Sequence, residues 1–208
     1  MIMSMNNSER DFYGKQTDEN ILYVVKPHPL ATTFGLIKIY LVAVVISLIL
    51  IILGTQIPSL LGIFVTSAII LFLLIAVIGT RIVLDWQKRS ISYITDRRLV
   101  HFEPTTLFAT NSRTLTWDEV VKVKTFPPNV IWKQMAIGNV VVHARTPIHP
   151  GGQDDSIGMS VDDVELKDVF YYRDLGNYID KILFTYKQKP SEIDNIKPFV
   201  PRPRGERY

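Results

Sequence analysis

The sequence predicts an α+β membrane protein, in which a transmembrane hairpin of two helices is followed by a small antiparallel β-barrel or sandwich and a C-terminal helix. Three observations lead to this fold class. Ile39–Thr80 holds 42 residues without one Asp, Glu, Lys or Arg. After Lys88, apolar residues alternate along short runs, as in half-buried strands. Near the C-terminus, apolar residues recur with the period of an amphipathic helix.

The uncharged stretch has the length of two membrane spans, since one helix needs roughly 20 apolar residues to cross a bilayer core of about 30 Å. Gly54–Ser59 interrupts it with a helix-stopping Gly, a polar pair and a Pro. We therefore expect a hairpin over residues 34–83, with spans at 34–53 and 60–80. The alternative is a pair of buried core helices, which the remaining, mostly polar chain would have to cover. A signal peptide fits less well, because a long polar segment precedes the first span.

Positive charges flank the hairpin on one side only. The loop between the spans has no Lys or Arg, and the basic residues of the flanks are Lys26, Lys38, Arg81, Lys88 and Arg89. The positive-inside rule therefore predicts a cell membrane protein with two spans and both termini in the cytoplasm. The spans lack the ionisable groups that a transporter or intramembrane enzyme normally needs, which indicates an anchor.

The two ends of the chain are expected to lie outside the folded parts. Residues 1–33 are a polar cytoplasmic leader, and the first 20 of them show no apolar period, so we expect flexibility there. Ile21–Val25 has the composition of a short strand or an interfacial segment, and the pattern names no partner for it. Residues 188–208 are rich in Pro and Arg and are expected to form a disordered tail.

Residues 84–187 are expected to form one cytoplasmic domain. Ser90–Thr95 and Arg98–Phe102 are rich in strand-forming residues, and only two residues separate them, which is the spacing of a tight hairpin. Further strand candidates are Ser112–Leu115, Val120–Lys124, Ile137–Ala144 and Val164–Val169. A final helix is expected at about 173–187. Its apolar stripe consists of Leu175, Tyr178, Ile179, Ile182, Leu183 and Tyr186. Such a helix can close the open end of a β-barrel.

Composition limits the chemistry. The chain has no Cys, which excludes disulfides, thiolate metal sites and thiol nucleophiles. After Thr80 there are 19 Lys or Arg against 16 Asp or Glu, so attraction to an anionic surface is weak. The basic residues form no dense run with interleaved aromatics, and we therefore expect no nucleic-acid binding. No cofactor motif is present.

The most specific pattern after the hairpin is the string Tyr93-Ile94-Thr95-Asp96-Arg97-Arg98-Leu99. Trp86, Leu115–Val121 and Ile137–Val142 add a hydrophobic pattern. Together with the hairpin, these residues resemble the bacterial membrane-flanked pleckstrin-homology-like (PH-like) family over roughly residues 20–186. The resemblance implies a bent antiparallel sheet of about seven strands capped by one helix. It also implies a membrane-anchored binding or assembly module with no established enzymatic activity.

The chain departs from the PH domains that bind phosphoinositides. Those domains place basic residues on the first two strands in a Lys-x(n)-Lys/Arg-x-Arg pattern, and Leu99 stands here where the last Arg is sought. The candidate contacts to anionic headgroups of a phospholipid membrane are Lys88, Arg89, Arg97 and Arg98. Each would contribute about 1 kcal/mol near a charged leaflet. The alternative is an ordinary solvated flank and turn. The cations that would extend the patch are Arg113, Lys122, Lys124 and Lys133.

Small residues recur at helical spacing in the two spans. They are Ala43 and Ser47 in the first and Gly62 and Thr66 in the second, with Ser59 just before it. Such residues let helix backbones approach closely, so we expect the two helices to pack there.

Two histidines are candidates for a metal site or an acid–base pair. His101 and His143 each share a predicted strand face with a polar neighbour, Glu103 and Asn139 respectively. No His-x-x-x-His, Glu-x-x-His or nucleophile elbow is present, and surface histidines are the favoured interpretation. A group of acidic residues lacks the spacing of an EF-hand and is expected to form a solvated loop. It consists of Asp154, Asp155, Asp162, Asp163 and Glu165.

These observations predict a non-enzymatic, membrane-anchored module at the cytoplasmic face. We expect it to bind a partner protein, a lipid or a second copy of itself. Two alternatives stay open. One is a subunit of a larger membrane complex, such as an export or stress-resistance assembly, whose hairpin packs against other spans. The other is a membrane-bound hydrolase that uses His101 or His143.

Overall fold

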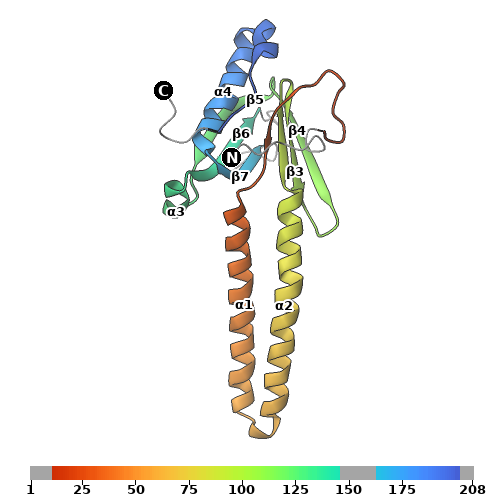
Figure 1. Cartoon of the computed structure of the whole chain (residues 1–208), viewed down its shortest axis with the longest axis vertical. Helices are drawn as coiled ribbons and strands as arrows, with labels where there is room; N and C mark the ends of the chain where they lie inside the picture. The colour runs from red at the N-terminus through yellow and green to blue at the C-terminus, as the bar shows by residue number, and fades with distance from the viewer. Residues whose placement is uncertain (1–10, 146–162, 202–208) are drawn as a thin grey trace, which may run out of the picture. The chain divides into compact units, whose positions relative to one another are not determined.

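The computed structural model describes residues 11–145 and 163–201. They form two compact units. The helical unit contains residues 28–89 together with 106–109, and the sheet unit contains the other described residues. The layout is α+β, with two long apolar helices and two antiparallel sheets (Figure 1).

The helical unit is built from α1 (Pro29–Thr55) and α2 (Leu61–Arg89), joined by the short 3-10 helix η2 (Pro58–Leu60). The two long helices run side by side in Figure 1. Both extend beyond the spans expected at 34–53 and 60–80, because helical hydrogen bonding continues into polar flanking turns. Both are long and apolar enough to cross a membrane.

Local chemistry sets the outer ends of these helices. His28 caps α1, since its Nδ1 accepts a hydrogen bond from the backbone N–H of Leu30 at 3.2 Å, and Pro29 follows as the first helical residue. Lys88 and Arg89 occupy the last turn of α2, where the helix dipole favours cations. The Gln87 side chain donates to the carbonyl of His28 at 3.3 Å, so these ends lie together.

Small residues line the seam between α1 and α2. Ala43 is fully buried there, and Ser47 Oγ donates to the Ala43 carbonyl at 2.8 Å and also lies 3.3 Å from the Ala68 carbonyl of the other helix. A Cβ added to Gly54 would lie 2.7 Å from Phe64 Cβ, and one added to Gly79 would lie 2.5 Å from Ile39 Cγ2. The two backbones therefore approach closely at both glycines.

Two of the four residues predicted for this seam do not lie in it. Thr66 is exposed, and a Cβ added to Gly62 would meet no atom within 4 Å. Ala68 is the buried residue of α2, and at 3.6 residues per turn Gly62 and Thr66 lie roughly 120° and 160° around the helix from it. Their prediction is wrong, whereas Ala43 and Ser47 do lie in the seam.

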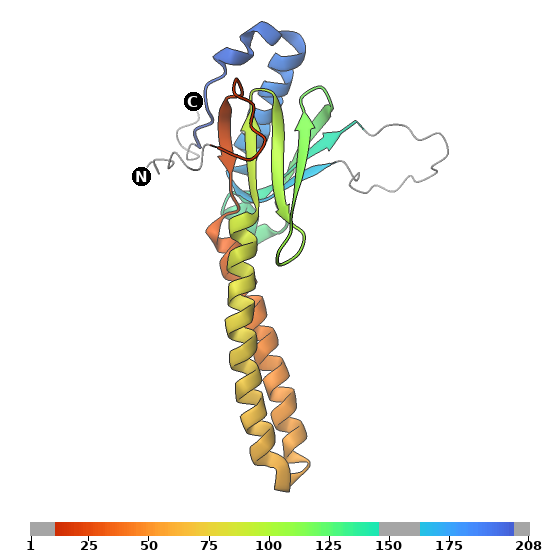
Figure 2. The ribbon, with the colours of Figure 1, turned by 90° about the vertical axis from the view of Figure 1, so that its right-hand side faces the viewer.

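Sheet A has four antiparallel strands in the order β1-β2-β3-β4, and Figure 2 shows them side by side. Their bounds are Ile21–Val25, Ile91–Thr95, Arg98–Pro104 and Thr110–Thr116. β1 pairs with β2, which supplies the partner that the sequence did not name. The tight β2–β3 hairpin is confirmed, with Ile94 opposite Leu99.

Sheet B has three antiparallel strands in the order β5-β6-β7. Their bounds are Val120–Phe126, Ile137–Ala144 and Val164–Phe170, and the short helix α3 (Val130–Gln134) joins β5 to β6. Tyr171 adopts a left-handed conformation with φ 52° and turns the chain from β7 into α4 (Tyr172–Gln188). A Cβ added to Gly176 of α4 would lie 2.2 Å from Thr125 of β5, so the helix packs tightly on this sheet.

One hydrophobic core joins both sheets and α4. Its fully buried side chains include Trp117, whose indole Nε1 donates to the Thr95 carbonyl at 3.1 Å. The predicted stripe of α4 is confirmed, because Leu175, Ile179 and Ile182 are fully buried in this cluster. Burial of each such side chain stabilises the fold by about 1.5–3 kcal/mol.

The N-terminal leader is more structured than expected. Residues 11–20, which we call the strap, are described together with the sheet unit, and Glu19 within them is only 2% exposed. The following β1 lies in sheet A, and α1 already begins at Pro29. The expectation of a flexible segment is therefore wrong for residues 11–20, because side-chain contacts hold the strap without any apolar period.

The first part of the C-terminal tail also packs on the sheet unit. It begins with the 3-10 helix η3 (Pro190–Asn195). The Phe199 ring lies 4.8 Å from that of Tyr23, and its N–H donates to the Leu22 carbonyl at 3.3 Å. Burial raises the pKa of Tyr178 to about 12, and its hydroxyl donates to the Lys197 carbonyl at 2.8 Å. The expected disorder is therefore wrong for residues 188–201, and residues 202–208 lie outside the described residues.

Candidate functional site

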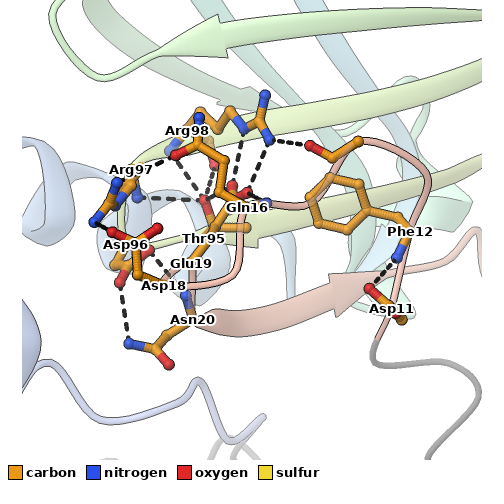
Figure 3. Close-up of polar contacts among 11 residues, drawn as sticks. Asp11, Phe12, Gln16, Asp18, Glu19, Asn20, Thr95, Asp96, Arg97 and Arg98 are labelled. Carbon is orange, nitrogen blue, oxygen red and sulfur yellow. Dashed lines mark hydrogen bonds and ion pairs between the residues drawn. The ribbon is translucent and has the colours of Figure 1, made fainter.

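The β2–β3 turn carries a buried ion pair between Arg98 and Glu19 of the strap (Figure 3). The guanidinium binds the carboxylate through two hydrogen bonds, Nε to Oε1 at 2.9 Å and Nη2 to Oε2 at 2.8 Å. The Thr95 hydroxyl donates to Glu19 Oε1 at 2.8 Å, and the Gln16 N–H donates to Oε2 at 3.1 Å. The Glu19 side chain is fully buried and that of Arg98 is 19% exposed.

This geometry fixes the charge of both groups. Burial alone would raise the pKa of Glu19, but the hydrogen bonds from Arg98, Gln16 and Thr95 outweigh it and lower the pKa to about 2. The hydrogen bonds between Arg98 and Glu19, reinforced by the charge of Glu19, raise the pKa of Arg98, although burial opposes this. The pair is therefore ionised at neutral pH, and Arg98 anchors the strap to sheet A.

Neighbouring residues extend this network. Arg97 pairs with Asp18 and donates to Gln16 Oε1 at 3.1 Å. Asp96 accepts two hydrogen bonds from Asn20, from the backbone N–H at 3.1 Å and from the side-chain amide at 3.2 Å. Because the Arg97–Asp18 pair is half exposed, it contributes less than the buried pair beside it.

An aromatic cluster completes the strap contact. The Phe12 ring lies 4.7 Å from that of Tyr93 and 6.4 Å from that of Phe102, measured between ring centroids. The guanidinium carbon of Arg98 lies 5.8 Å from the centroid of the same Phe12 ring. The strap therefore covers one face of sheet A with apolar as well as ionic contacts.

The four cations predicted as one lipid contact do not form one patch. Lys88 and Arg89 end α2, whereas Arg97 and Arg98 follow the far end of β2, a strand of five residues that spans roughly 17 Å. The guanidinium of Arg98 is held by Glu19 and by the Gly14 carbonyl, to which it donates at 2.7 Å. Lys88 is exposed and Arg89 is partly exposed, so these two stay the predicted lipid contacts.

The cations expected to extend that patch fall in separate places. Lys122 and Lys124 are exposed on β5, which is an edge strand of sheet B, and Lys133 is exposed on α3. Arg113 on β4 is partly buried and donates to the Asp163 carbonyl at 3.4 Å. The first three are therefore exposed cations of β5 and α3, whereas Arg113 is engaged on β4.

His101 is paired with a serine inside the protein. Its Nδ1 lies 2.7 Å from Ser92 Oγ across the β2–β3 ladder, and both residues are buried. Burial lowers the pKa of His101, an effect that Glu103 opposes and that Lys167 and Arg113 reinforce. The imidazole is therefore neutral at neutral pH. Because both partners are buried, the pair faces protein rather than an open substrate site.

His143 is paired with an acid that stands directly before the next strand. Its Nδ1 lies 2.8 Å from Asp163 Oδ2, and the other carboxylate oxygen accepts the Ala144 N–H at 3.0 Å. The Nε2 atom is buried and has no hydrogen-bond partner among the described residues. This arrangement fixes the ring on β6 and joins β6 to the start of β7.

The acidic residues expected as a solvated loop are only partly described. Asp154, Asp155 and Asp162 lie outside the described residues. Asp163 is bound as above, and Glu165 accepts a hydrogen bond from the Asn139 amide at 2.7 Å. In residues 11–145 and 163–201, no three His, Asp or Glu side chains come together as they would around a metal ion.

Sequence reasoning missed Glu19, the most deeply buried charge among the described residues. The strap residues looked like a soluble leader, because acidic residues near a terminus are usually solvated. The available signal was indirect: Arg97 and Arg98 stand together at a tight turn, and Asp18 and Glu19 stand together just before a strand. Matching these two doublets would have predicted the contact.

Comparisons with family models, with curated proteins and with solved structures find no match for this chain.

Proposed function

We propose that the chain is an integral protein of the cell membrane whose helical unit is a two-span anchor. One observation carries this proposal. In the most apolar 18-residue stretch of each helix, only 6% of the residues are buried. A core helix of a soluble protein would be mostly buried, so these surfaces need another apolar environment. A bilayer supplies it over about 30 Å, the length of roughly 20 helical residues.

Charge supports an orientation for this anchor. The connection between α1 and α2, residues 56–60, has no Lys or Arg, whereas Arg81, Lys88 and Arg89 stand near the other end of α2. Lys38 stands on α1 between Ile37 and Ile39, and Ile39 packs against Gly79 close to Arg81. The positive-inside rule then favours a cytoplasmic location for the sheet unit and both termini.

We infer further that the sheet unit is a PH-like module that binds a partner and catalyses no reaction. Its order of elements supports this: four and three antiparallel strands, followed by one helix on the core. The part of the chain best suited to a partner is β5 together with α3. It combines exposed apolar Val121, Val130 and Ile131 with exposed Lys122, Lys124 and Lys133. Edge strands can also pair with an added strand.

A cross-linking pull-down of the full-length protein from its native membrane tests this proposal. Three samples are compared: the wild type, a Lys122→Glu/Lys124→Glu variant, and a Lys88→Gln/Arg89→Gln variant. Each is first checked for unchanged membrane insertion. A protein partner that is lost only with the first variant supports a binding module with an acidic partner. Anionic lipid that is lost only with the second variant makes lipid the ligand.

Other results would overturn the binding role. One such result is a membrane-embedded partner that is lost with Gly62→Leu and Thr66→Leu but kept with both charge variants described above. That result would favour a subunit of a larger complex. Gly62 and Thr66 are the relevant positions because both face away from α1 and are exposed. Recovery of neither lipid nor protein in any sample would contradict both readings.

A further inference from the structure

The loop that joins β3 to β4 presents apolar side chains to solvent. We call residues 105–109 the β3–β4 loop. Phe108 at its tip is 96% exposed and Leu107 is 43% exposed. The sequence has no charged residue from Pro104 to Ser112. A single exposed leucine is ordinary, but an aromatic ring held almost clear of the protein within an uncharged run is typical of a contact surface.

Strand register puts this loop at the end of sheet A that is joined to the helices. Ile91 begins β2 directly after α2 and Ser90, and it pairs with Phe102. β3 then continues past that pair to Pro104 and enters the loop. At the same end of the sheet, Val25 pairs with Ser92 and is joined to α1 by three residues. Residues 106–109 also group with the helical unit.

Chain lengths are consistent with a loop tip at the height of the lipid headgroups. The four residues from Phe102 to Thr106 extend roughly 13 Å as a strand. The charged end of α2, from Arg81 to Arg89, is roughly 12 Å long as a helix. If the hydrocarbon core ends near Arg81, a loop of this reach is long enough to bring Phe108 to the boundary between headgroups and acyl chains.

Three backbone N–H groups of the loop already have hydrogen-bond partners within it. Thr106 Oγ1 accepts hydrogen bonds from the N–H groups of Phe108 at 3.4 Å and Ala109 at 3.0 Å. The Thr106 N–H donates to the Ala109 carbonyl at 3.3 Å. Unpaired backbone donors make entry into an apolar phase costly, and this turn removes that cost for three N–H groups.

We propose that the β3–β4 loop inserts Leu107 and Phe108 into the interface of the same membrane that α1 and α2 span. This proposal rests on the anchoring proposed above and adds a second contact with the bilayer. Aromatic and leucine side chains are favoured at that depth. The contact would restrain the sheet unit against the membrane, with the β3–β4 end directed to the lipid.

The absence of cysteine makes the proposal testable with single labels. Full-length protein carrying Leu107→Cys is labelled with an environment-sensitive NBD maleimide and reconstituted into phosphatidylcholine–phosphatidylglycerol vesicles. Matched labels are placed at Tyr13, which is 98% exposed in the strap, and at Ile52, which is 60% exposed on α1. Quenching by a lipid carrying a shallow nitroxide is compared with quenching by aqueous iodide.

We expect the nitroxide lipid to quench the label at 107 and iodide not to reach it, whereas the label at 13 should show the reverse. The Phe108→Asp substitution should make the label at 107 accessible to iodide. A label at 107 that behaves like the label at 13, while the label at 52 is quenched by lipid, would overturn the loop contact and leave the anchor intact. Protection from both quenchers would overturn it too, since protein would cover the loop. An iodide-accessible label at 52 would refute the anchor itself.

Discussion

At the residue scale, the Arg98–Glu19 pair decides whether the strap stays on the sheet. The carboxylate is fully buried, so it is tolerated only with its bidentate partner and the added hydrogen bonds from Thr95 and Gln16. The half-exposed Arg97–Asp18 pair is beside it in sequence and offers a matched comparison. The two ion pairs have the same chemistry and differ mainly in how deeply they are buried, so a comparison of their variants measures the effect of burial.

Arg98→Ala should destabilise the full-length protein by about 3–5 kcal/mol, because it leaves a buried carboxylate without its partner. For a chain of this size, that loss corresponds to a fall of about 10 °C in Tm. Thermal unfolding in detergent, followed by tryptophan fluorescence, measures it. Arg97→Ala is the control and should cost less than about 1 kcal/mol. Equal effects of the two variants would show that Glu19 does not depend on Arg98.

Protonation of Glu19 should make the stability of the folded protein depend on pH. Its pKa in the folded protein is about 2, below the ordinary value of 4.5, so the unfolded chain binds the proton more readily. The stability that this group contributes is thus fully present above about pH 4.5 and is lost as pH falls towards 2. We expect the Tm difference between wild type and Glu19→Gln to narrow over that window. A constant difference would contradict the lowered pKa.

At the element scale, the seam of α1 and α2 depends on where each small residue points. Gly54 and Gly79 permit close contact, whereas Gly62 faces open space on the same helix as Gly79. Helical spacing alone identified Ala43 and Ser47 correctly and Gly62 and Thr66 wrongly. The face that a helix presents depends on how it is rotated against its partner, and the spacing of small residues leaves that rotation undetermined.

Gly54→Ala should weaken the hairpin by about 1–3 kcal/mol, because the new methyl would overlap Phe64 Cβ, which cannot move away as a side-chain tip can. Gly62→Ala introduces the same methyl where no atom lies within 4 Å, so its stability should be unchanged or slightly raised. Thermal unfolding of both variants in detergent compares them. Similar losses at the two positions would mean that the helices pack through another face.

Elements with a strong local period were predictable, and contacts between distant single residues were not. The stripe of α4 and the β2–β3 hairpin follow from neighbours a few residues apart. The strap and the C-terminal segment have no period, and each is held by partners far away in the chain, such as Glu19 with Arg98 and Phe199 with Tyr23. The predicted domain bounds are therefore wrong at 11–20 and at 188–201 for the same reason: contacts between residues far apart in the chain leave no local pattern.

At the scale of the whole molecule, the two units would have separate roles. In the proposed arrangement, the helical unit would meet lipid through its mostly exposed apolar side chains, and the sheet unit is held together by its own core. The linkers are short, since one residue separates α2 from β2 and three separate β1 from α1. If the helical unit is a membrane anchor as proposed, these short linkers would keep the sheet unit close to the membrane surface.

The central claim is a two-span hairpin with the sheet unit on the cytoplasmic side, and cysteine accessibility in intact cells tests it most directly. Single variants Ser59→Cys, at the connection between the helices, and Lys122→Cys, on the exposed edge of sheet B, are treated with a maleimide that cannot cross membranes. We predict that Ser59→Cys reacts in intact cells and that Lys122→Cys reacts only after the membrane is opened. Reaction at Lys122→Cys in intact cells, or recovery of the protein in the soluble fraction, would contradict it.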